Sequence, residues 1–293
     1  MAARIIDGNA IAAEVRAEVA AGVAELVAAG RRPPHLTAVL VGDDAASATY
    51  VRLKHRDCAE VGMTSDTVAL PATATQAEIL AVVRGLNAND AVDGVIVQKP
   101  LPPGVDDALV DATLDAGKDA DGLGPTSLGR LVQGAPVFIP ATPSGIQQLL
   151  LRSGIDPAGK RVVIVGRSIL VGRPLAMLLS AKAAGANATV TIAHTGTSDL
   201  GSVTREADIL VAAAGRRNLI TADMVQPGAV VIDVGTNRVD DPSKKAGFRL
   251  AGDVDFDAVK EIASAITPVP GGVGPMTRAM LLVNALKAAR AAS

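Results

Sequence analysis

The alternation of short apolar runs with longer helical patterns is the feature that most constrains the fold. In the first hundred residues, runs rich in β-branched residues alternate with segments whose apolar residues recur every three or four positions. In chain order, helical and strand-like segments fall at 11–29, 36–41, 49–61, 67–70, 76–87 and 94–97. Such alternation is typical of βαβ units, in which helices cover a mostly parallel sheet. We therefore predict an α/β domain in the first half.

A second set of strands is predicted after residue 160. The strand-like runs are 162–165, 188–193, 209–213 and 229–234. They follow a stretch from Gly117 to Pro143 that is dense in Gly, Pro and Thr, which we interpret as the loop leading out of the first domain, and a helix predicted over 145–152. The second half is thus predicted to be another α/β unit.

The last part of the chain indicates how the two halves are joined. The segment 267–276, TPVPGGVGPM, is too rich in Pro and Gly for regular structure, and Thr277 is predicted to cap a final helix that runs towards Ala291. That helix is expected to return to the first domain. The predicted domains are therefore 1–140 with 277–293, and 141–276.

Composition excludes several classes of protein. The chain has 28 Lys and Arg against 30 Asp and Glu, and almost no aromatic residues, so neither charge nor stacking surface favours binding to nucleic acid. No apolar run approaches the length of a membrane span, and no secretory signal is visible. One Cys and three scattered His leave no metal-site pattern, so we expect no metal and a cytoplasmic location.

A glycine-rich turn after a predicted strand indicates a dinucleotide site. Gly166, Arg167 and Ser168 directly follow the run 162–165, and Gly172 lies at the start of a predicted helix. Glycines let a pyrophosphate approach the backbone, and the helix N-terminus offers free N–H groups. The spacing departs from GxGxxG, so a simple tight connection is the alternative reading.

The residues at the end of the next strand favour NADP over NAD. An NAD site usually carries Asp or Glu there, about 20 residues after the glycines, to bind the ribose 2′-hydroxyl. Here the chain reads Ala193-His194-Thr195, with no carboxylate, whereas Arg167 and Thr195 are suited to a 2′-phosphate. The segments 214–215 and 235–237 also end apolar runs and are expected at the same sheet edge. Solvated loop residues remain the alternative.

A second group of polar residues is expected in the first domain. Tyr50 and Lys54 lie four residues apart in a helical pattern and so share one face. Gln98 follows the strand 94–97, and Asp121 lies in the turn KDADG. A lysine that acts as a base must lose its charge, and a Gln supplies hydrogen bonds without a negative charge that would oppose this. Spacing alone favours a solvated helix charge for Lys54 and an aromatic at the edge of the core for Tyr50.

Eight segments together resemble the bifunctional methylenetetrahydrofolate dehydrogenase/methenyltetrahydrofolate cyclohydrolases, in the order and spacing of that family. They are AVLVGDDAASATYVRLKHRDCAEVGM, DGVIVQKPLPPG, KDADGLGPTSLGRL, ATPSGI, GKRVVIVGRSILVG, ATVTIAHTGT, VIDVGTNR and TPVPGGVGPMT. The resemblance implies two α/β domains around a cleft, with one-carbon derivatives of tetrahydrofolate bound on the first, NADP on the second, and usually a homodimer. The implied activities are NADP-dependent oxidation of 5,10-methylenetetrahydrofolate and hydrolysis of the methenyl product to 10-formyltetrahydrofolate.

The resemblance also implies roles for individual residues. Lys54 would be the central catalytic residue with Gln98 assisting it, Tyr50 would pack against the folate ring system, and Asp121 would bind the amino-pyrimidine edge of the pterin. The loop beside the folate would include Pro268, Gly271 and Gly272. The cofactor positions would be Gly166, Arg167, Ser168, Gly172, Thr195 and Thr236.

Several residues depart from the family's usual pattern. Lys99 stands where Leu is common, which puts a cation next to Gln98. Gly124 and Ser127 replace common His and Asn, Ala141 and Ala193 replace common Cys, and Ile169-Leu170 replaces a more usual Asn-Ile. None of these removes a proposed catalytic group, but together they leave the ratio of the two activities open.

Three alternative functions remain at this point. As alternatives to the bifunctional enzyme, the chain would be a dehydrogenase with weak or no cyclohydrolase activity, another two-domain NADP oxidoreductase such as a shikimate-dehydrogenase-like enzyme, or a nucleotide-sensing module. The last would have no use for the Tyr50 and Lys54 pair, and the second does not explain TPVPGGVGPMT.

Overall fold

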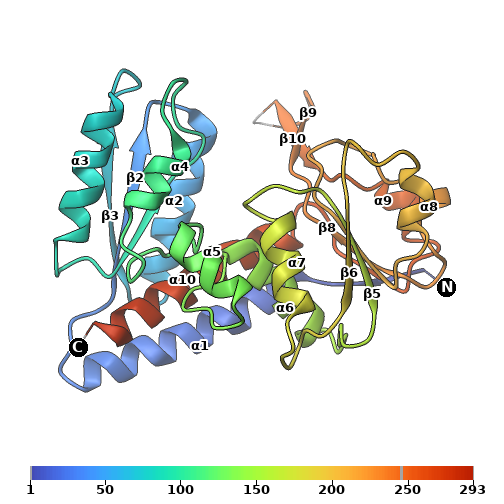
Figure 1. Ribbon diagram of the computed structural model, residues 1–293, viewed down its shortest axis with the longest axis horizontal. Coiled ribbons are helices and arrows are strands. Elements are labelled where there is room, and N and C mark those ends of the chain that lie inside the picture. Colours follow the sequence, from blue (N-terminus) through green and yellow to red (C-terminus); the bar gives the residue numbers. More distant parts are fainter. Residues whose placement is uncertain (1, 245–246, 293) are drawn as a thin grey trace. The chain divides into compact units, whose positions relative to one another are not determined.

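The computed structural model describes residues 2–244 and 247–292 and divides into two compact units (Figure 1). The first comprises Met1–Ala12 and Thr142–Thr277, and is called here the large-sheet unit. The second comprises Ala13–Ala141 and Arg278–Ser293, and is called the small-sheet unit. Each is described by itself below.

The small-sheet unit is built on three parallel strands in the order β3-β2-β4. These are β2 (His35–Val41), β3 (Thr64–Leu70) and β4 (Gly94–Val97). Helix α2 (Ala45–Glu60) connects β2 to β3, and α3 (Gln76–Asn87) connects β3 to β4. The predicted alternation of strands and helices is confirmed.

The core of this unit forms because the helices bury apolar faces against the sheet. On α3, Ile79, Leu80 and Val83 are buried and pack with residues of β2 and β4. Each such side chain contributes about 1.5–3 kcal/mol when fully buried. The N-terminus of α3 is fixed by a capping box, in which Thr75 accepts from the Glu78 backbone and the Glu78 carboxylate accepts from the Thr75 backbone.

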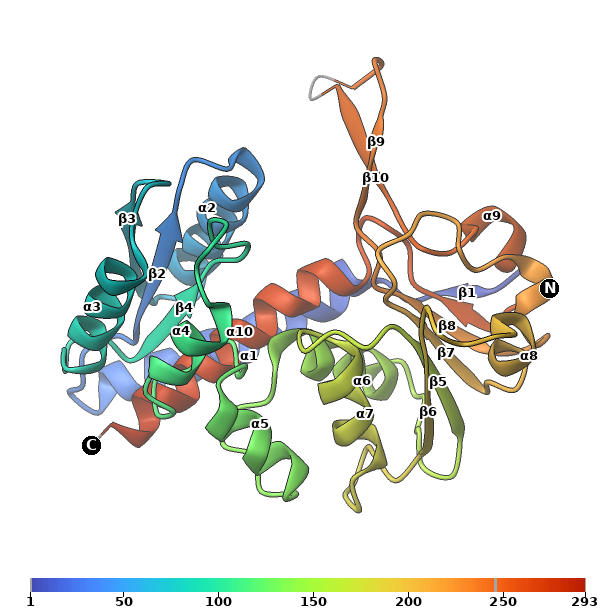
Figure 2. The same cartoon turned by 45° about the horizontal axis from the view of Figure 1, so that its top comes forward.

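Two long helices lie side by side along this unit, as Figures 1 and 2 both show. They are α1 (Gly8–Ala28) and α10 (Val273–Ala291), and they are joined by an ion pair of 3.0 Å between Glu25 and Arg290. The Asn284 side chain of α10 donates to the carbonyls of Ala120 and Ile139. Helix α10 therefore anchors both ends of the segment 120–139, which follows β4 in the chain.

Two predictions for the connecting segments were wrong. The stretch 117–143 is not a continuous loop, because it contains α5 (Pro125–Val132) and the start of α6 (Ala141–Arg152). Pro125 at the first position of α5 needs no N–H partner, so its presence starts a helix rather than preventing one. Thr277 does not cap α10 but lies inside it, where its hydroxyl donates to the Val273 carbonyl. A further helix, α4 (Asp107–Thr113), was not predicted.

The large-sheet unit contains a six-stranded parallel sheet in the order β1-β11-β8-β7-β5-β6. Its strands are β1 (Arg4–Ile5), β5 (Arg161–Val165), β6 (Thr189–Ala193), β7 (Ile209–Ala212), β8 (Val230–Asp233) and β11 (Ala265–Ile266). The helices of this unit include α6, α7 (Gly172–Ser180), α8 (Leu200–Thr204), α9 (Phe256–Val259) and the 3-10 turn η1 (Ala222–Met224). The chain leaves β5 for β6 on one side and then crosses to β7 on the other. The carboxyl end of β5 is therefore a topological switch point, where such sheets bind ligands.

The N-terminus belongs to the large-sheet unit, which differs from the prediction that placed residues 1–140 together. The reason is that β1 pairs with β11, with Arg4 opposite Ala265 and Ile5 opposite Ile266. A two-residue strand has too little pattern to be recognised in the sequence, so this edge of the sheet was not predicted.

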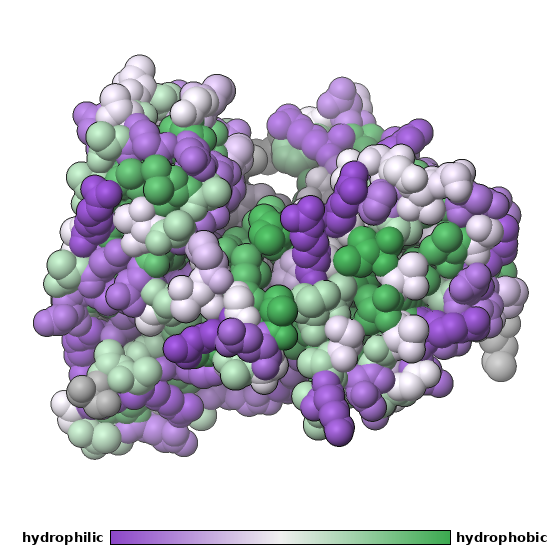
Figure 3. Space-filling model, viewed as in Figure 1, coloured by the Kyte–Doolittle hydropathy of each residue, from purple (hydrophilic) through white to green (hydrophobic). Residues whose placement is uncertain are grey.

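An antiparallel hairpin projects from the large-sheet unit in Figure 2. It is formed by β9 (Asn237–Asp240) and β10 (Phe248–Ala251), and the guanidinium of Arg238 lies 3.9 Å from the centre of the Phe248 ring. Hydrophilic and hydrophobic residues are interspersed on the face of the molecule drawn in Figure 3. Among the described residues, no helix combines the length and apolar character that crossing a bilayer requires.

Candidate active site and cofactor site

Lys54 and Gln98 are joined by a hydrogen bond in the small-sheet unit. The Lys54 ammonium Nζ on α2 donates to Oε1 of Gln98 at 3.2 Å. Gln98 directly follows β4, and its Nε2 donates to the Lys99 carbonyl at 2.8 Å. Because Nε2 is occupied in this way, the amide oxygen faces Lys54. The N-terminus of α2 is fixed by Asp44, which accepts from the Ser47 backbone at 2.7 Å.

Tyr50 lies one helical turn before Lys54 on α2. Residues four apart on a helix are neighbours on its surface, so both belong to one face. The Tyr50 side chain is 42% exposed, which leaves its ring available for contact with a ligand.

Asp121 reaches the same edge of the sheet from another segment. Val95 of β4 forms an isolated parallel bridge with Asp119, so the chain pairs with the edge of the sheet at this point and Asp121 follows two residues later. The Asp121 carboxylate accepts no hydrogen bond from any residue that the structure describes. Burial raises its pKa, while the ammonium groups of Lys54 and Lys99 lower it. Lys54, Gln98 and Asp121 are therefore brought together.

Asp119 was not predicted as a site residue, but it organises the turn that carries Asp121. Its carboxylate is buried and accepts from the backbone of Gly122 at 3.0 Å and Gly124 at 2.8 Å, and from the Ser127 hydroxyl at 2.6 Å. A Cβ at Gly124 would lie 3.0 Å from this carboxylate. Gly124 and Ser127, which differ from the residues common in the family, therefore both help Asp119 to hold the turn that carries Asp121.

The glycine-proline loop lies in the other unit. Pro268, Gly271 and Gly272 belong to the large-sheet unit, whereas Lys54 belongs to the small-sheet unit. Gly271 has φ of +107°, and a Cβ at Gly272 would lie 2.6 Å from the Pro268 carbonyl. Both positions therefore require glycine for the loop itself.

The predicted glycine turn lies at the switch point of the large sheet. Gly166 follows β5 with φ of +136°, and a Cβ there would overlap the Ala213 carbonyl at the end of β7. A Cβ at Gly172 would overlap the Gly166 carbonyl. The Ser168 hydroxyl accepts from the Val171 backbone at 3.2 Å, and no side chain caps α7. The turn is thus tightly packed, and no side chain of the described residues caps the N-terminus of α7.

Arg167 lies next to the end of β6. Its Nη1 is 3.5 Å from Nε2 of His194, and Thr195 beside it is exposed. The His194 backbone donates to the Thr197 hydroxyl at 2.9 Å, which shapes the turn that follows β6. The structure therefore brings Arg167 and Thr195 to neighbouring strand ends, as the NADP prediction requires.

Two buried carboxylates that were not predicted organise the rest of this edge. Asp253 accepts from the backbones of Ala214 at 2.7 Å and Gly215 at 2.8 Å, and from the Asn237 amide at 2.8 Å. Its carboxylate therefore ties the loop after β7 to the start of β9. Thr236, predicted to contact the cofactor, precedes Asn237 and is exposed.

Asp233 ends β8 and holds the segment that carries Asp253. Its carboxylate accepts from the backbones of Gly235 at 2.9 Å, Asp253 at 2.9 Å and Val254 at 3.0 Å. Burial raises the pKa of Asp233 to about 6, although these hydrogen bonds lower it. The dense group of Gly and Asp in VIDVG and AGDVD was the available signal, because carboxylates inside turns need neighbours without side chains.

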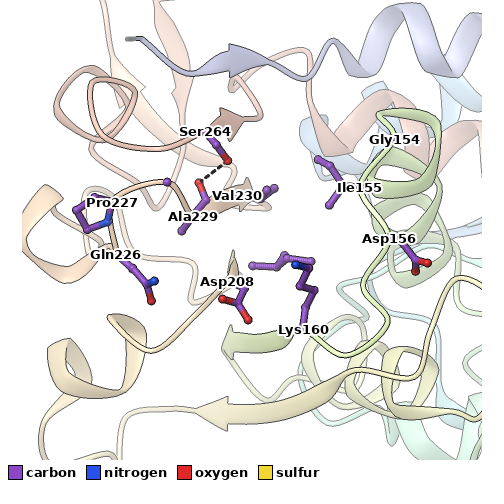
Figure 4. Close-up of a pocket in the computed structure, with 12 residues that line it drawn as sticks. Gly154, Ile155, Asp156, Lys160, Asp208, Gln226, Pro227, Ala229, Val230 and Ser264 are labelled. Atoms are coloured by element: carbon purple, nitrogen blue, oxygen red, sulfur yellow. Dashed lines mark hydrogen bonds between the residues drawn. The ribbon is translucent and has the colours of Figure 1, made fainter.

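A cavity of about 370 Å³ lies at the opposite, amino edge of the large sheet (Figure 4). It is lined by Lys160, Asp208 and Ser264, which precede β5, β7 and β11. The Asp208 carboxylate accepts from the Arg161 backbone at 2.8 Å, and the Ser264 hydroxyl donates to the Ala229 carbonyl at 3.3 Å. This cavity is therefore separate from the glycine turn at the carboxyl ends of the strands.

The large-sheet unit has the features of a dinucleotide-binding protein. Glycines at 166 and 172 leave room for a pyrophosphate beside the backbone, the N-terminus of α7 offers N–H groups, and Arg167 supplies a cation. These residues fit a phosphorylated dinucleotide cofactor. Together with the Lys54 and Gln98 pair, they define the class as two-unit α/β enzymes that use a nicotinamide dinucleotide.

Comparison with known proteins identifies the family. The profile described as "Tetrahydrofolate dehydrogenase/cyclohydrolase, catalytic domain" matches residues 6–121, and that described as "Tetrahydrofolate dehydrogenase/cyclohydrolase, NAD(P)-binding domain" matches residues 140–293. The chain belongs to the tetrahydrofolate dehydrogenase/cyclohydrolase family. The resemblance seen in the sequence is confirmed.

Several relatives are similar over their full length. The "Bifunctional protein FolD" of Rhodopirellula baltica is 54% identical, covering 99% of this chain and 98% of that protein. The protein of the same name from Salinibacter ruber is 56% identical, covering 98% and 96%. The crystal structure of the Trypanosoma brucei N5,N10-methylenetetrahydrofolate dehydrogenase-cyclohydrolase, complexed with NADP cofactor and inhibitor, is 41% identical, with a TM-score of 0.94 and coverage of 99% and 98%.

Proposed function

We propose that this protein oxidises 5,10-methylenetetrahydrofolate to 5,10-methenyltetrahydrofolate with NADP, and hydrolyses the product to 10-formyltetrahydrofolate. The observation that carries the proposal is the hydrogen bond between Lys54 and Gln98, near the Asp121 carboxylate, which accepts no hydrogen bond from a described residue. Family membership and the relatives called bifunctional support both activities.

The oxidation requires loss of hydride from the carbon that bridges N5 and N10 of the folate. When bound, NADP supplies the hydride acceptor. The chain's contribution is to bind and orient: Gly166, Ser168 and Gly172 hold the pyrophosphate, and Arg167 and Thr195 bind the 2′-phosphate. Thr236 contacts the cofactor from the loop after β8. No protein group has to transfer a proton in this step.

The hydrolysis requires proton removal from water and proton delivery to N5. Lys54 is the group proposed to move these protons. Gln98 holds the amine through its oxygen, and the Lys99 carbonyl keeps the amide of Gln98 in that orientation. Because an amide has no charge, Gln98 positions the amine without holding a proton on it electrostatically.

The remaining residues bind the folate. Asp121 accepts the N–H groups of the amino-pyrimidine edge, a charge-assisted interaction that its unoccupied oxygens allow. Tyr50 packs its exposed ring against the pterin. We also assign Pro268, Gly271 and Gly272 to a loop that contacts the folate, although they belong to the other unit.

We further propose that the enzyme is a cytoplasmic homodimer that acts on small-molecule folates and not on nucleic acid. The near balance of basic and acidic residues supports the last point. Size-exclusion chromatography with light scattering tests the dimer: a species of one chain mass at micromolar concentration would contradict it.

The function is tested by two assays on the purified chain. In the first, NADP reduction is followed with 5,10-methylenetetrahydrofolate, and the assay is repeated with NAD. In the second, loss of methenyltetrahydrofolate absorbance is followed without cofactor. Activity in both is expected. Reduction of NADP without accelerated hydrolysis would leave a dehydrogenase alone, and no activity in either would refute the proposal.

A further inference from the structure

His194 is the first residue after β6, at the carboxyl edge of the large sheet. The ends of β5 and β6 lie side by side, because the Gly166 backbone donates to the Ala193 carbonyl at 2.8 Å. His194 is half-buried, and among the described residues each ring nitrogen has one polar neighbour. In a βαβ nucleotide site, the end of the second strand is where the group on the ribose 2′-carbon lies.

The contacts of the His194 ring determine which nitrogen carries the proton. The Gly196 backbone N–H donates to Nδ1 at 3.0 Å, so Nδ1 holds no proton and accepts through its lone pair. A neutral imidazole keeps its proton on the other nitrogen, and the hydrogen-bond network therefore assigns it to Nε2. The ring thus presents an N–H donor at Nε2.

This donor faces a second donor. Nη1 of Arg167 lies 3.5 Å from Nε2 of His194, and a guanidinium carries N–H groups but no acceptor. Two N–H groups cannot bond to each other, so this approach is a meeting of donors rather than a hydrogen bond. Among the described residues, neither group has an acceptor. An oxyanion that accepts from both would satisfy them.

The charge around the two donors also favours an anion. Arg167 supplies a positive charge, and the segment 194–198 contains no Asp or Glu. The next carboxylate along the chain, that of Asp199, accepts from the Ser202 backbone at 3.0 Å and caps α8. The turn after β6 therefore brings donors to this place without a carboxylate of its own.

The same turn holds the imidazole in position. The Thr197 backbone donates to the His194 carbonyl at 2.8 Å, and the His194 backbone donates to the Thr197 hydroxyl at 2.9 Å. With the bond from Gly196 to Nδ1, these contacts fix both the backbone and the ring of His194. A donor that is already fixed loses little freedom when a ligand binds, which favours affinity.

We propose that His194 is a specificity-determining residue, whose Nε2–H binds the phosphate on the ribose 2′-carbon of NADP together with the Arg167 guanidinium. A phosphate has several charged acceptor oxygens and can accept from both donors, whereas the 2′-hydroxyl of NAD has one neutral oxygen. This inference rests on the proposed function, because it assumes that NADP binds at this edge of the sheet. It adds a neutral donor to the residues assigned to the 2′-phosphate.

The test compares the binding of adenosine 2′,5′-bisphosphate and 5′-AMP by calorimetry, because the two nucleotides differ only in the 2′-phosphate. His194→Asn can place its amide oxygen where Nδ1 lies, so the bond from Gly196 is kept, but no group reaches the position of Nε2. Its affinity for the bisphosphate should fall by about tenfold, as expected for a charge-assisted hydrogen bond, while its affinity for AMP stays within about twofold of wild type.

His194→Gln is the complementary variant and separates binding from a structural role. Its amide N–H reaches the position of Nε2, but it has no acceptor at the position of Nδ1, so it should keep most of the preference for the bisphosphate. If His194 only shaped the turn through Nδ1, His194→Gln would be the more harmful change and His194→Asn would bind as wild type does. That result would overturn the proposal. His35→Asn, in the small-sheet unit, is the matched control and should bind both nucleotides as wild type does.

A free anion has the same chemistry as the phosphate of the cofactor, and inorganic phosphate separates the two sources. Inorganic phosphate should compete with the bisphosphate and not with AMP. If wild type binds inorganic phosphate but binds the bisphosphate and AMP equally well, the donors take a free anion and the assignment to the 2′-phosphate is overturned.

Failure of the inference is distinguishable from failure of the proposed function. If wild type prefers the bisphosphate and His194→Asn has the same preference, only the role of His194 fails. If His194→Asn loses the preference as expected while wild type turns over neither folate substrate, the proposed function fails and the role of His194 in binding the phosphate stands.

Discussion

Carboxylates near the strand ends are used differently in the two units. In the large-sheet unit, Asp233 and Asp253 direct their oxygens at backbone N–H groups and one amide. In the small-sheet unit, Asp119 does the same for its turn, whereas Asp121 accepts no hydrogen bond from a described residue. A carboxylate whose oxygens are occupied holds a loop, and one whose oxygens are free is ready for a ligand.

This difference separates effects on stability from effects on binding. Removing an occupied carboxylate strands buried N–H groups and should destabilise the fold. Removing an unoccupied carboxylate should change the stability of the fold little and should lower the affinity for the ligand. Substitutions at both kinds of position therefore test the distinction.

The largest effect is expected for Lys54→Met. The variant keeps the stem of the side chain but cannot move a proton, so hydrolysis of methenyltetrahydrofolate should fall by roughly 10²–10⁴-fold, the usual contribution of a general acid or base. Loss of the methenyl absorbance measures this rate. Binding of 5-formyltetrahydrofolate should remain detectable, which shows that the site is intact. An unchanged hydrolysis rate would remove Lys54 from the mechanism.

Asp253→Ala tests the occupied type of carboxylate. It removes the hydrogen bonds donated by the backbones of Ala214 and Gly215 and by the Asn237 amide, and at about 0.5–1.5 kcal/mol for each the variant should lose about 1.5–4.5 kcal/mol of unfolding free energy. Urea unfolding followed by circular dichroism measures the loss. Asp241→Ala, whose carboxylate lies at the surface in a turn, is the control and should stay near wild type. Equal stability of the two variants would contradict the comparison.

The pH dependence of stability tests the neighbouring Asp233. Its pKa is about 6 in the folded protein against an ordinary 3.8, so the folded state holds this proton more tightly. The contribution to stability is therefore greatest below about pH 4 and is lost as pH rises through 6, by about 3 kcal/mol in total. The difference in unfolding free energy between wild type and Asp233→Asn should decline over this range.

The control for this prediction should change in the opposite direction. The hydrogen bond from Lys260 lowers the pKa of the exposed Asp257, so its contribution is present above the ordinary pKa and is lost as pH falls. The difference between wild type and Asp257→Asn should therefore rise slightly with pH. If the difference in unfolding free energy between wild type and Asp233→Asn does not change between pH 4 and 7, burial does not raise the pKa of Asp233.

Much of the fold was predictable because it is encoded locally. The helix over 76–87 and the strand over 94–97 were predicted at their observed bounds, since a capping box and a run of β-branched residues mark them. Strand β1 and helix α5 were not predicted. The first has two residues and exists only through pairing with β11, and the second is short and begins at a proline.

The candidate site was predictable only where one residue carried its own signal. Lys54 was recognised from helical spacing and resemblance, and Gly166 from the strand before it. Asp119, Asp233 and Asp253 were missed because their role depends on backbone N–H groups from other turns, which no sequence pattern shows. Of the two acids in KDADG, the sequence alone does not distinguish the one that is enclosed from the one that is free.

Asp121→Ala tests the unoccupied type of carboxylate. The loss of a charge-assisted hydrogen bond should weaken 5-formyltetrahydrofolate binding by about 1.5–3 kcal/mol, or roughly 10–150-fold, as measured by calorimetry. The free energy of unfolding should change by less than about 0.5 kcal/mol, since no described residue donates to this carboxylate. A variant with wild-type affinity, or one as destabilised as Asp253→Ala, would place Asp121 with the structural carboxylates.

The smallest effect is expected at Arg167, which extends the comparison from carboxylates to a cation. Arg167 is exposed, and within the described residues its guanidinium has one polar contact, to His194 at 3.5 Å, so like Asp121 it is largely unoccupied and should serve a ligand. Arg167→Ala should weaken NADP binding by about tenfold with little effect on NAD, because only NADP carries the 2′-phosphate. The ratio of the two dissociation constants, measured from NADPH and NADH fluorescence, reports this directly. Arg205→Ala, which removes an arginine of the same unit whose guanidinium donates to the Asp223 carbonyl, is the matched control. If both variants leave the ratio unchanged, the 2′-phosphate is bound by residues other than Arg167.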